Sequence, residues 1–231
     1  MDQQKKCIKI NTILWKMWIL KLFEKNYFIM AALQNHKILV TGGDGRFAKV
    51  LKQKNKKLNL IFANKNQCNI LKTNSIETIV KKIKPKTIIH CAGLSRPMDE
   101  HEKNINKSIN LNIIGTANIT KVCQKYKIKL IYFSTNYVYE GTKGNYSETD
   151  SIKPFNNYGL SKMGGECSVL MYENSLILRI SMTEKPFLFN KAFTNLKSNY
   201  LFHEDLVFML PKLINKKGII HIGGKPQSVY D

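Results

Sequence analysis

The sequence has little arginine and little negative charge. Only three of its 37 cationic residues are arginine, and 16 acidic residues leave a formal net charge of +21. Basic chains bind nucleic acids, anionic membranes or polyanionic small molecules, but recognition surfaces favour arginine for its planar fork. The lysines cluster between apolar segments, where loops and helix ends place them in solvent. We therefore interpret most of the charge as solvated surface lysine and expect neither a nucleic acid nor a membrane as partner.

Long hydrophobic runs are also absent. None approaches the roughly 18 residues that span a bilayer, which excludes a polytopic membrane protein. The 231 residues are nevertheless 43% hydrophobic, which excludes a wholly disordered chain. A chain of this length and composition is expected to bury one sizeable core in one domain.

Paired cysteines and metal-ligand spacings are missing as well. The five cysteines are scattered and form no C-x-x-C pair, which excludes a disulfide framework and a zinc site. A reducing compartment fits best, so we expect a cytoplasmic protein. The histidines show no metal spacing, so we predict no metal site. We interpret His101, which lies in an acidic segment, as part of a solvated helix start.

Residues 1–36 differ from the rest and form an N-terminal extension of uncertain status. The segment is apolar but interrupted by lysines that do not share one helical face. It lacks the small-residue cleavage site of a secretory signal. Three readings stay open: an accessory helix, a weak membrane-surface anchor, or a stretch upstream of a true start at Met30. The intact mass of the native protein distinguishes the third from the others.

From residue 37 onward, apolar strands alternate with helical periodicity. Such strands predict a parallel sheet that helices cover on both faces. We therefore predict an α/β fold, a doubly wound Rossmann-type domain over 37–231, with short substrate-binding insertions near 136–157 and 181–231. The expected strands are 38–40, 58–63, 87–91, 130–133 and 176–180, and the expected helices are 46–53, 75–84, 109–126 and 162–172.

A glycine-rich turn follows the first expected strand and opens a helix. It reads Thr41-Gly42-Gly43-Asp44-Gly45-Arg46-Phe47-Ala48. Glycines there let the backbone turn tightly and approach a pyrophosphate, which binds free N–H groups at the helix start. The turn predicts a cofactor site that comprises Gly42, Gly43, Asp44, Gly45, Arg46 and Phe47.

The second expected strand helps to choose the cofactor. An NAD enzyme usually carries a carboxylate there to bind the ribose hydroxyls. This sequence has Asn64 and Lys65 instead, with Arg46 in the glycine turn. Two cations and no acid favour the 2′-phosphate of NADP, with NAD as the alternative.

Two further groups carry acid/base chemistry. Tyr158 and Lys162 are one helical turn apart and share a face, so the ammonium is expected to lower the pKa of the phenol. Ser134 and Thr135 end the fourth expected strand, where ligands of parallel sheets bind. A hydroxyl there can bond the substrate oxygen that Tyr158 protonates.

In their order, these segments resemble the extended short-chain dehydrogenase/reductases. The resemblance rests on Thr41–Ala48, Cys91-Ala92-Gly93, Asn112–Thr116, Ser134–Tyr139 and Tyr158–Lys162. More narrowly, Ser134–Tyr139, Gly141, Gly144, Tyr146, Glu148, Asp150, Pro154 and Gly165-Glu166 resemble the dTDP-4-dehydrorhamnose reductase branch.

The resemblance implies NAD(P)H-dependent reduction of a nucleotide-linked 4-keto-6-deoxy sugar. It implies that Tyr158 donates the proton, that Lys162 lowers its pKa and holds the nicotinamide ribose, and that Thr135 bonds the substrate oxygen. Asn112 would help position the lysine, and Ala92-Gly93 would pass beside the cofactor. Related dehydratases carry an Asp-Glu pair after the threonine; Asn136-Tyr137 here disfavours dehydration.

The sequence also departs from that branch, whose members have a longer substrate-binding portion. The portion after residue 180 is small or truncated, so a partner chain would complete the pocket, or the activity differs. A nucleotide-sugar epimerase and a non-catalytic NADP-binding regulatory subunit therefore stay open. The regulatory subunit of methionine adenosyltransferase resembles the same branch. A homodimer is a further expectation, because helices around the tyrosine segment often pair in relatives.

Overall fold

The computed structural model describes residues 36–185 and 197–228. The expected N-terminal extension therefore lies outside the described residues, apart from His36. The same holds for part of the C-terminal insertion expected at 181–231.

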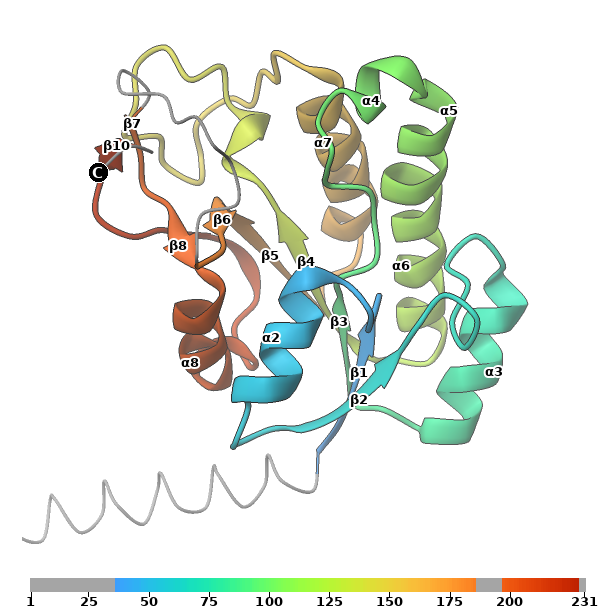
Figure 1. Ribbon diagram of the computed structural model, residues 1–231. Helices are drawn as coiled ribbons and strands as arrows, with labels where there is room; N and C mark the ends of the chain where they lie inside the picture. Colours follow the sequence, from blue (N-terminus) through green and yellow to red (C-terminus); the bar gives the residue numbers. More distant parts are fainter. Residues whose placement is uncertain (1–35, 186–196, 229–231) are drawn as a thin grey trace, which may run out of the picture.

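A six-stranded parallel sheet forms the centre of the described structure, in the order β2-β1-β3-β4-β5-β9 (Figure 1). Because β2 and β3 lie on opposite sides of β1, the order in which strands are added to the sheet reverses between β1 and β3, and ligands of such sheets bind at this switch point. The strands of the sheet are β1 (Lys37–Thr41), β2 (Asn59–Ala63), β3 (Thr87–His90), β4 (Lys129–Ser134), β5 (Ser175–Ile180) and β9 (Gly218–Ile222).

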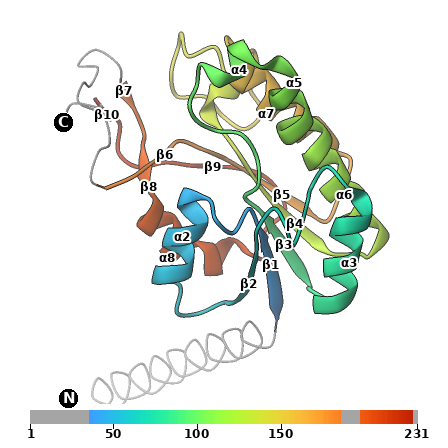
Figure 2. The ribbon, with the colours of Figure 1, turned by 45° about the vertical axis from the view of Figure 1, so that its right-hand side comes forward.

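Helices cover both faces of this sheet, and a few short strands lie beyond its carboxyl edge (Figures 1 and 2). The helices are α2 (Arg46–Lys54), α3 (Thr73–Ile83), α4 (Glu100–Lys103), α5 (Ile105–Ser108), the π-helical turn η1 (Ile109–Ile114), α6 (Gly115–Lys125), the 3-10 turn η2 (Asn136–Val138), α7 (Asn157–Leu170) and α8 (His203–Leu213). The short strands are β6 (Met182–Thr183), β7 (Lys197–Ser198), β8 (Leu201–Phe202) and β10 (Gln227–Ser228).

Each face of the sheet has its own apolar core, because successive residues of a strand point to opposite faces. Ile38 and Val40 pack with α2 and α8, whereas Leu39 packs with α3, α6 and α7. All four residues of β3 and all six of β4 and β5 are buried, as strands covered on both faces must be. The predicted parallel α/β fold with helices on both faces is confirmed.

The end of the chain departs from the sequence-based expectation. The predicted strands stopped at residue 180, but β9 adds a sixth parallel strand beside β5, and α8 packs against α2. Much of the segment assigned to a substrate-binding insertion therefore completes the sheet. Gly218 and His221 interrupt the apolar run of β9, whose residues are buried less completely than those of the central strands, so the sequence pattern did not identify it as a strand.

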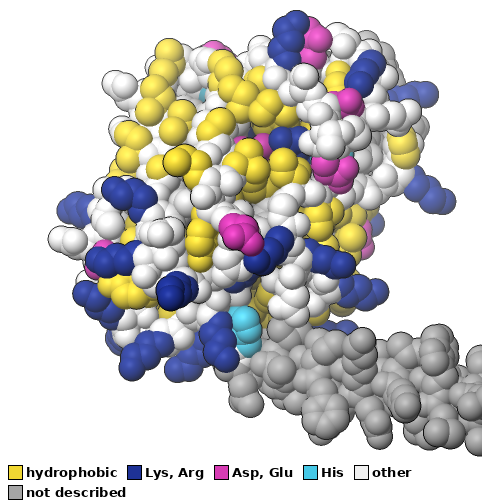
Figure 3. Space-filling model, turned by 180° about the vertical axis from the view of Figure 1, so that it is seen from behind, with side chains coloured by type: hydrophobic (Ala, Val, Ile, Leu, Met, Phe, Trp, Pro, Cys, Tyr) yellow, Lys and Arg dark blue, Asp and Glu magenta, His cyan; other side chains and the backbone are white. Residues whose placement is uncertain are grey.

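Most lysines among the described residues lie at the surface, but Lys129 does not. Figure 3 shows Lys and Arg side chains spread around one face rather than gathered in a single patch. Lys129, expected in solvent, is buried, and its Nζ donates to the carbonyl oxygen of Lys216 at 2.5 Å. Burial lowers the pKa of Lys129 to about 8. Among the described residues, no helix is both long and apolar enough to cross a bilayer.

Candidate active site

The glycine-rich turn lies at the carboxyl end of β1, against the end of β3. Gly42 has a φ of +67°, and a Cβ atom added there would lie 2.7 Å from the Cα of Ala92. Only glycine combines this backbone conformation with such a close approach. Gly45 precedes α2 without a side-chain cap, and the first turn of α2 holds no acidic residue. Free N–H groups at the start of a helix are a binding site for anions, so the turn can hold a phosphate.

A buried hydroxyl and imidazole hold this turn against β3. The Thr41 hydroxyl accepts a hydrogen bond from the Ala92 N–H at 3.2 Å and lies 2.8 Å from Nδ1 of His90. His90 Nε2 lies 3.3 Å from the hydroxyl of Thr116 on α6. Burial lowers the pKa of His90 to about 3, so the ring is neutral. The sequence predicts that His90 lies in a strand, but nothing in it indicates this role in positioning Ala92.

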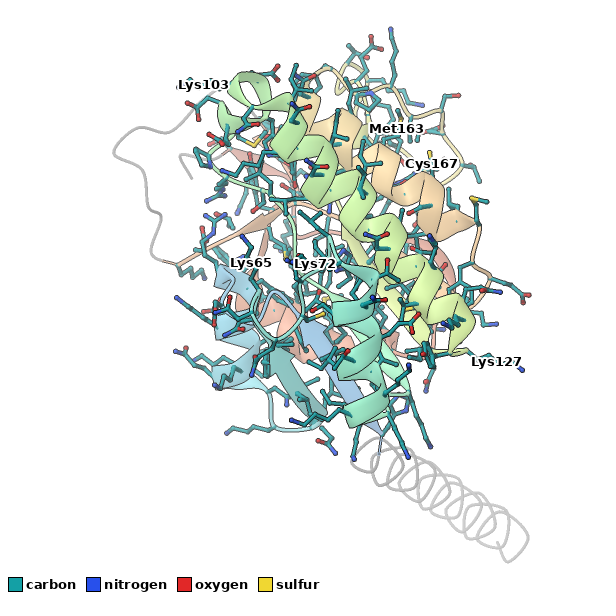
Figure 4. The ribbon with its side chains drawn as sticks, turned by 90° about the vertical axis from the view of Figure 1, so that its right-hand side faces the viewer. Lys65, Lys72, Lys103, Lys127, Met163 and Cys167 are labelled. Carbon is teal, nitrogen blue, oxygen red and sulfur yellow. The ribbon has the colours of Figure 1, made fainter. Side chains whose placement is uncertain are left out.

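The remaining predicted cofactor residues lie around the turn, in different environments. Asp44, Arg46, Lys65 and Gly93 are exposed, and Lys65 lies in the loop after β2 (Figure 4). The side chain of Phe47 is buried, edge-on to Phe133 with ring centroids 5.1 Å apart. Only the backbone of Phe47 can therefore meet a ligand.

Tyr158 and Thr135, predicted to act together, are brought together by the structure. Thr135 follows β4, and its hydroxyl lies close enough to the Tyr158 phenol on α7 to lower the pKa of that phenol. Gly159 allows α7 to begin this close, because a Cβ there would collide with the Tyr137 carbonyl. Asn156 caps the helix, since its Oδ1 accepts from the Gly159 N–H at 2.8 Å.

The predicted effect of Lys162 on Tyr158 is not found in this structure. Burial raises the pKa of Tyr158, and the nearby Thr135 hydroxyl opposes that shift only in part. Lys162 instead places its Nζ over the ring of Tyr132, 4.2 Å from the centroid. Burial lowers the pKa of Lys162 to about 8, although the carboxylate of Glu166 raises it. At neutral pH the phenol therefore keeps its proton, as a proton donor must.

Asn112 has other partners than the lysine with which it was expected to act. Its side chain is buried in η1, donates to the carbonyl oxygen of Leu94 at 2.8 Å and to the hydroxyl of Ser161 at 2.9 Å, and accepts from the Leu94 N–H at 2.7 Å. Asn112 thus joins the loop after β3 to α7, one residue before Lys162. The π-helical turn that carries it is a feature frequent at functional sites.

The interpretation of His101 as solvated is wrong. The residue is fully buried, with Nδ1 2.7 Å from the Ser108 hydroxyl and the ring edge-on to Tyr158, 5.1 Å between centroids. The short helices α4 and α5 pack against α7. The acidic residues around His101 in the sequence do not indicate this tertiary contact. Burial lowers the pKa of His101.

The pair Asn136-Tyr137 brings no carboxylate to the site, as its sequence indicates. Asn136 Nδ2 donates to the Ser198 hydroxyl at 3.3 Å. The Tyr137 ring lies against Tyr158 and Phe155, with centroids 5.7 and 5.6 Å away. No group of three or more possible metal ligands occurs in the described ranges.

Replacing Lys162 by methionine should stabilise the protein. Because the pKa of Lys162 falls from 10.5 to about 8 on folding, its protonated amine destabilises the folded state below pH 8. The penalty is about 2–4 kcal/mol and disappears as pH rises from about 8 to 10.5. We expect the Lys162→Met variant to melt several degrees higher at pH 7, with a smaller difference at pH 10. Lys52→Met, on the exposed face of α2, serves as control. A lower melting temperature for Lys162→Met would contradict this account.

At the switch point Gly42 packs against Ala92, and Tyr158 lies beside Thr135. These features place the protein among the Rossmann-like α/β proteins. The chain belongs to the RmlD substrate binding domain family, whose model matches residues 36–198.

Curated relatives fall into two groups. The chain is 30% identical over 166 residues to the methionine adenosyltransferase 2 subunit beta of Danio rerio, covering 68% of this chain and 49% of the relative. It is 28% identical over 152 residues to the dTDP-4-dehydrorhamnose reductase of Aggregatibacter actinomycetemcomitans, covering 64% of this chain and 51% of the relative. The chain thus spans about half the length of these relatives.

Solved structures agree with the family. A dTDP-4-dehydrorhamnose reductase from Bacillus anthracis, crystallised with NADP, superposes with a TM-score of 0.76 at 26% identity. The match covers 84% of this chain and 76% of that one. The predicted resemblance to the dTDP-4-dehydrorhamnose reductase branch is confirmed.

Proposed function

We propose that the protein uses NADPH to reduce the keto group of a nucleotide-linked 4-keto-6-deoxy sugar, with Tyr158 as proton donor. The observation that carries the proposal is the proximity of the Thr135 hydroxyl to the Tyr158 phenol at the carboxyl edge of the sheet. A phenol and a hydroxyl this close together can both form hydrogen bonds to one carbonyl oxygen of a substrate. The kinship with reductases supports this assignment.

The turn at Gly42, Gly43 and Gly45 fits a dinucleotide, because its backbone packs tightly against its surroundings and leaves the N–H groups at the start of α2 free for phosphates. A Cβ atom at Gly42 would meet Ala92, and one at Gly43 would meet Ala63 at the end of β2. When bound there, the nicotinamide would supply a hydride to the carbonyl carbon. The backbone of the turn would hold the phosphates, and Ala92 and Gly93 would form the adjoining wall. Lys162 would bind the ribose.

The protein's own residues would orient the substrate oxygen and donate a proton to it. Thr135 would orient the substrate oxygen by donating to it. Tyr158, kept protonated by its raised pKa, would then release its proton to that oxygen as negative charge develops. His101 and Tyr137, packed edge-on against the phenol ring, would fix its direction. Asn112 would keep α7 and the loop after β3 in register.

A panel assay tests the reaction. Purified protein with NADPH and nucleotide-linked 4-ketosugars should show loss of absorbance at 340 nm with at least one substrate, with one NADPH consumed per sugar. An epimerase, the first alternative, would convert a sugar without net NADPH consumption. The absence of any turnover with the whole panel would overturn the reductase proposal.

A regulatory subunit is the second alternative, favoured by the identity to methionine adenosyltransferase 2 subunits beta. In that case the protein would bind NADP and a partner chain without turnover. Addition to a methionine adenosyltransferase catalytic subunit, followed by size-exclusion chromatography and activity measurement, distinguishes this function.

Lys65 should set the preference for NADPH over NADH. It is exposed after β2, at the place where an NAD enzyme usually carries a carboxylate. Arg46, the other predicted cation, contacts Ser95 and Glu184 instead. We expect Lys65→Ala to weaken NADPH binding about tenfold, or about 1.4 kcal/mol, and to leave NADH binding unchanged. Titration calorimetry with both cofactors measures this, and Lys72→Ala is the control. An equal loss for both cofactors would refute the role of Lys65 at the 2′-phosphate.

A further inference from the structure

A small cavity opens at the amino edge of the sheet, across the sheet from the candidate active site. Its volume is about 150 Å³, and residues that precede or begin five of the six parallel strands line it, among them His36, Thr87, Lys129, Asn174 and Lys217. Pockets for drug-sized ligands and cofactors measure roughly 300–1,000 Å³. The cavity therefore fits a small molecule or a single functional group, not a dinucleotide.

Lys129, at the start of β4, provides a buried amine beside this cavity. Its Nζ donates to the carbonyl oxygen of Lys216 at 2.5 Å and to that of Ser175 at 3.4 Å. An ammonium group has three N–H donors, and an unprotonated amine has two. The two carbonyl oxygens accept both N–H groups of the unprotonated amine, and its lone pair then points away from them. This arrangement suits a nucleophile.

The charges around the amine are positive. The Lys217 side chain is 54% exposed, and its ion pair with Glu173 at 3.6 Å is a weak surface pair, because Glu173 is 95% exposed. Burial and the charge of Lys217 lower the pKa of Lys129 to about 8. Lys86, before β3, similarly helps burial to lower the pKa of His36. Among the described residues that line the cavity, none is a carboxylate.

These surroundings make the amine reactive at neutral pH. With a pKa of about 8, about a tenth of the Lys129 side chains are unprotonated at pH 7, against roughly one in three thousand for a solvated lysine. The same positive charge that disfavours the ammonium attracts a small anion into the cavity. The cavity thus combines an unprotonated amine with a cation that is available to an anionic reactant.

We propose that Lys129 is a site of covalent acylation by small acyl phosphates, and that Lys217 binds the phosphate group of the donor. The Lys129 nitrogen attacks the acyl carbon, and the bond from that carbon to the phosphate oxygen breaks. Phosphate leaves with the electron pair, and the nitrogen gives up one proton to the solvent. The amide that forms keeps one N–H group, which donates to the carbonyl oxygen of Lys216.

Size and charge together select this class of donor. An acetyl phosphate molecule is small enough for the cavity and carries the negative charge that Lys217 attracts. An acyl thioester of coenzyme A carries a nucleotide, which the cavity does not accommodate. The product is favoured as well, because acylation removes a buried charge that the neighbouring Lys217 destabilises.

Limited reaction with acetyl phosphate at about pH 7.5, followed by peptide mass spectrometry, measures the rate at each lysine. We expect Lys129 to be acetylated about tenfold faster than Lys121, which is exposed on α6. The same reaction in urea should proceed at equal rates at the two lysines, because unfolding gives both the ordinary pKa. Inorganic phosphate should compete with acetyl phosphate in the folded protein and slow the reaction at Lys129.

Lys217→Gln tests the binding of the phosphate group. It should slow acetylation of Lys129 by acetyl phosphate about fivefold more than acetylation by p-nitrophenyl acetate, a donor without charge. A higher pKa of Lys129 in this variant slows both reactions alike, so the difference between the two donors reports on the phosphate group. Lys212→Gln, on the exposed face of α8, is the matched control and should change neither rate.

Equal rates at Lys129 and Lys121 in the folded protein would overturn the acylation site. So would a preference for Lys129 that persists in urea, or one for acetyl phosphate that Lys217→Gln leaves unchanged. Because the cavity lies across the sheet from Tyr158, none of these results depends on whether the protein reduces a ketosugar.

Discussion

Replacing Tyr158 by phenylalanine should lower turnover about a thousandfold, within the 10²–10⁴ range of acid/base catalysis, and leave the dissociation constant of NADPH within about twofold. The substitution removes one hydroxyl from a half-buried ring and leaves its edge-on contacts with His101 and Tyr137 in place. Cofactor binding is unaffected because the glycine turn is untouched. Stopped-flow turnover with NADPH and the reactive ketosugar, together with calorimetry, measures both quantities.

Tyr172→Phe controls for the loss of a phenol from the same region of the chain. Its hydroxyl donates to the carbonyl oxygen of Ile128 at 2.9 Å, outside the site. Thr135→Val should reproduce part of the loss at Tyr158, because the substrate oxygen would keep one of its two partners. Turnover by Tyr158→Phe at the wild-type rate would show that another group donates the proton.

Removing the charge of Glu166 should destabilise the fold by about 3–5 kcal/mol. Arg179 on β5 donates from Nε to Glu166 Oε1 at 3.1 Å and from Nη2 to Oε2 at 2.8 Å, and the two side chains are 3% and 0% exposed. Arg179 also donates to the Tyr139 hydroxyl and, at 3.3 Å, to the Glu148 carbonyl oxygen. Glu166→Gln leaves a guanidinium buried without its counter-ion, which is the costly outcome.

Urea unfolding monitored by circular dichroism gives the free energy of unfolding of the variant. Glu140→Gln is the control, because Glu140 pairs with Lys153 at 2.7 Å on the surface and its loss should leave the midpoint almost unchanged. If Glu166→Gln costs less than 1 kcal/mol, the buried pair does not hold α7 to β5 in the way described. Since α7 carries Tyr158, the same variant should also lose turnover.

The parts that the sequence predicts are those set by local periodicity. Apolar strand segments and helical spacing identify five of the six strands of the sheet and the principal helices, because burial on two faces demands continuous apolar runs. The glycine turn is predictable, since glycine is the residue that best combines the positive φ of Gly42 with its close approach to Ala92. The spacing of Tyr158 and Lys162 likewise follows from the helical turn.

Contacts between distant segments escape prediction. His101 is buried because α4 packs against α7, and the neighbouring sequence does not indicate this contact. The ion pairs of Glu184 join the start of α2 to the loops after β3 and β6, which only the folded sheet brings together. Lys129 is buried because the segment after α8 supplies a carbonyl oxygen to its amine. The direction of the Tyr158 pKa shift depends on burial, which spacing alone does not reveal.

A crystal structure of the protein with NADP⁺ tests the central claim most directly. The account predicts the diphosphate at the turn of Gly42 to Arg46 and the nicotinamide ring beside the hydroxyl groups of Tyr158 and Thr135. A cofactor bound elsewhere, or a nicotinamide ring outside the reach of Tyr158, would contradict it.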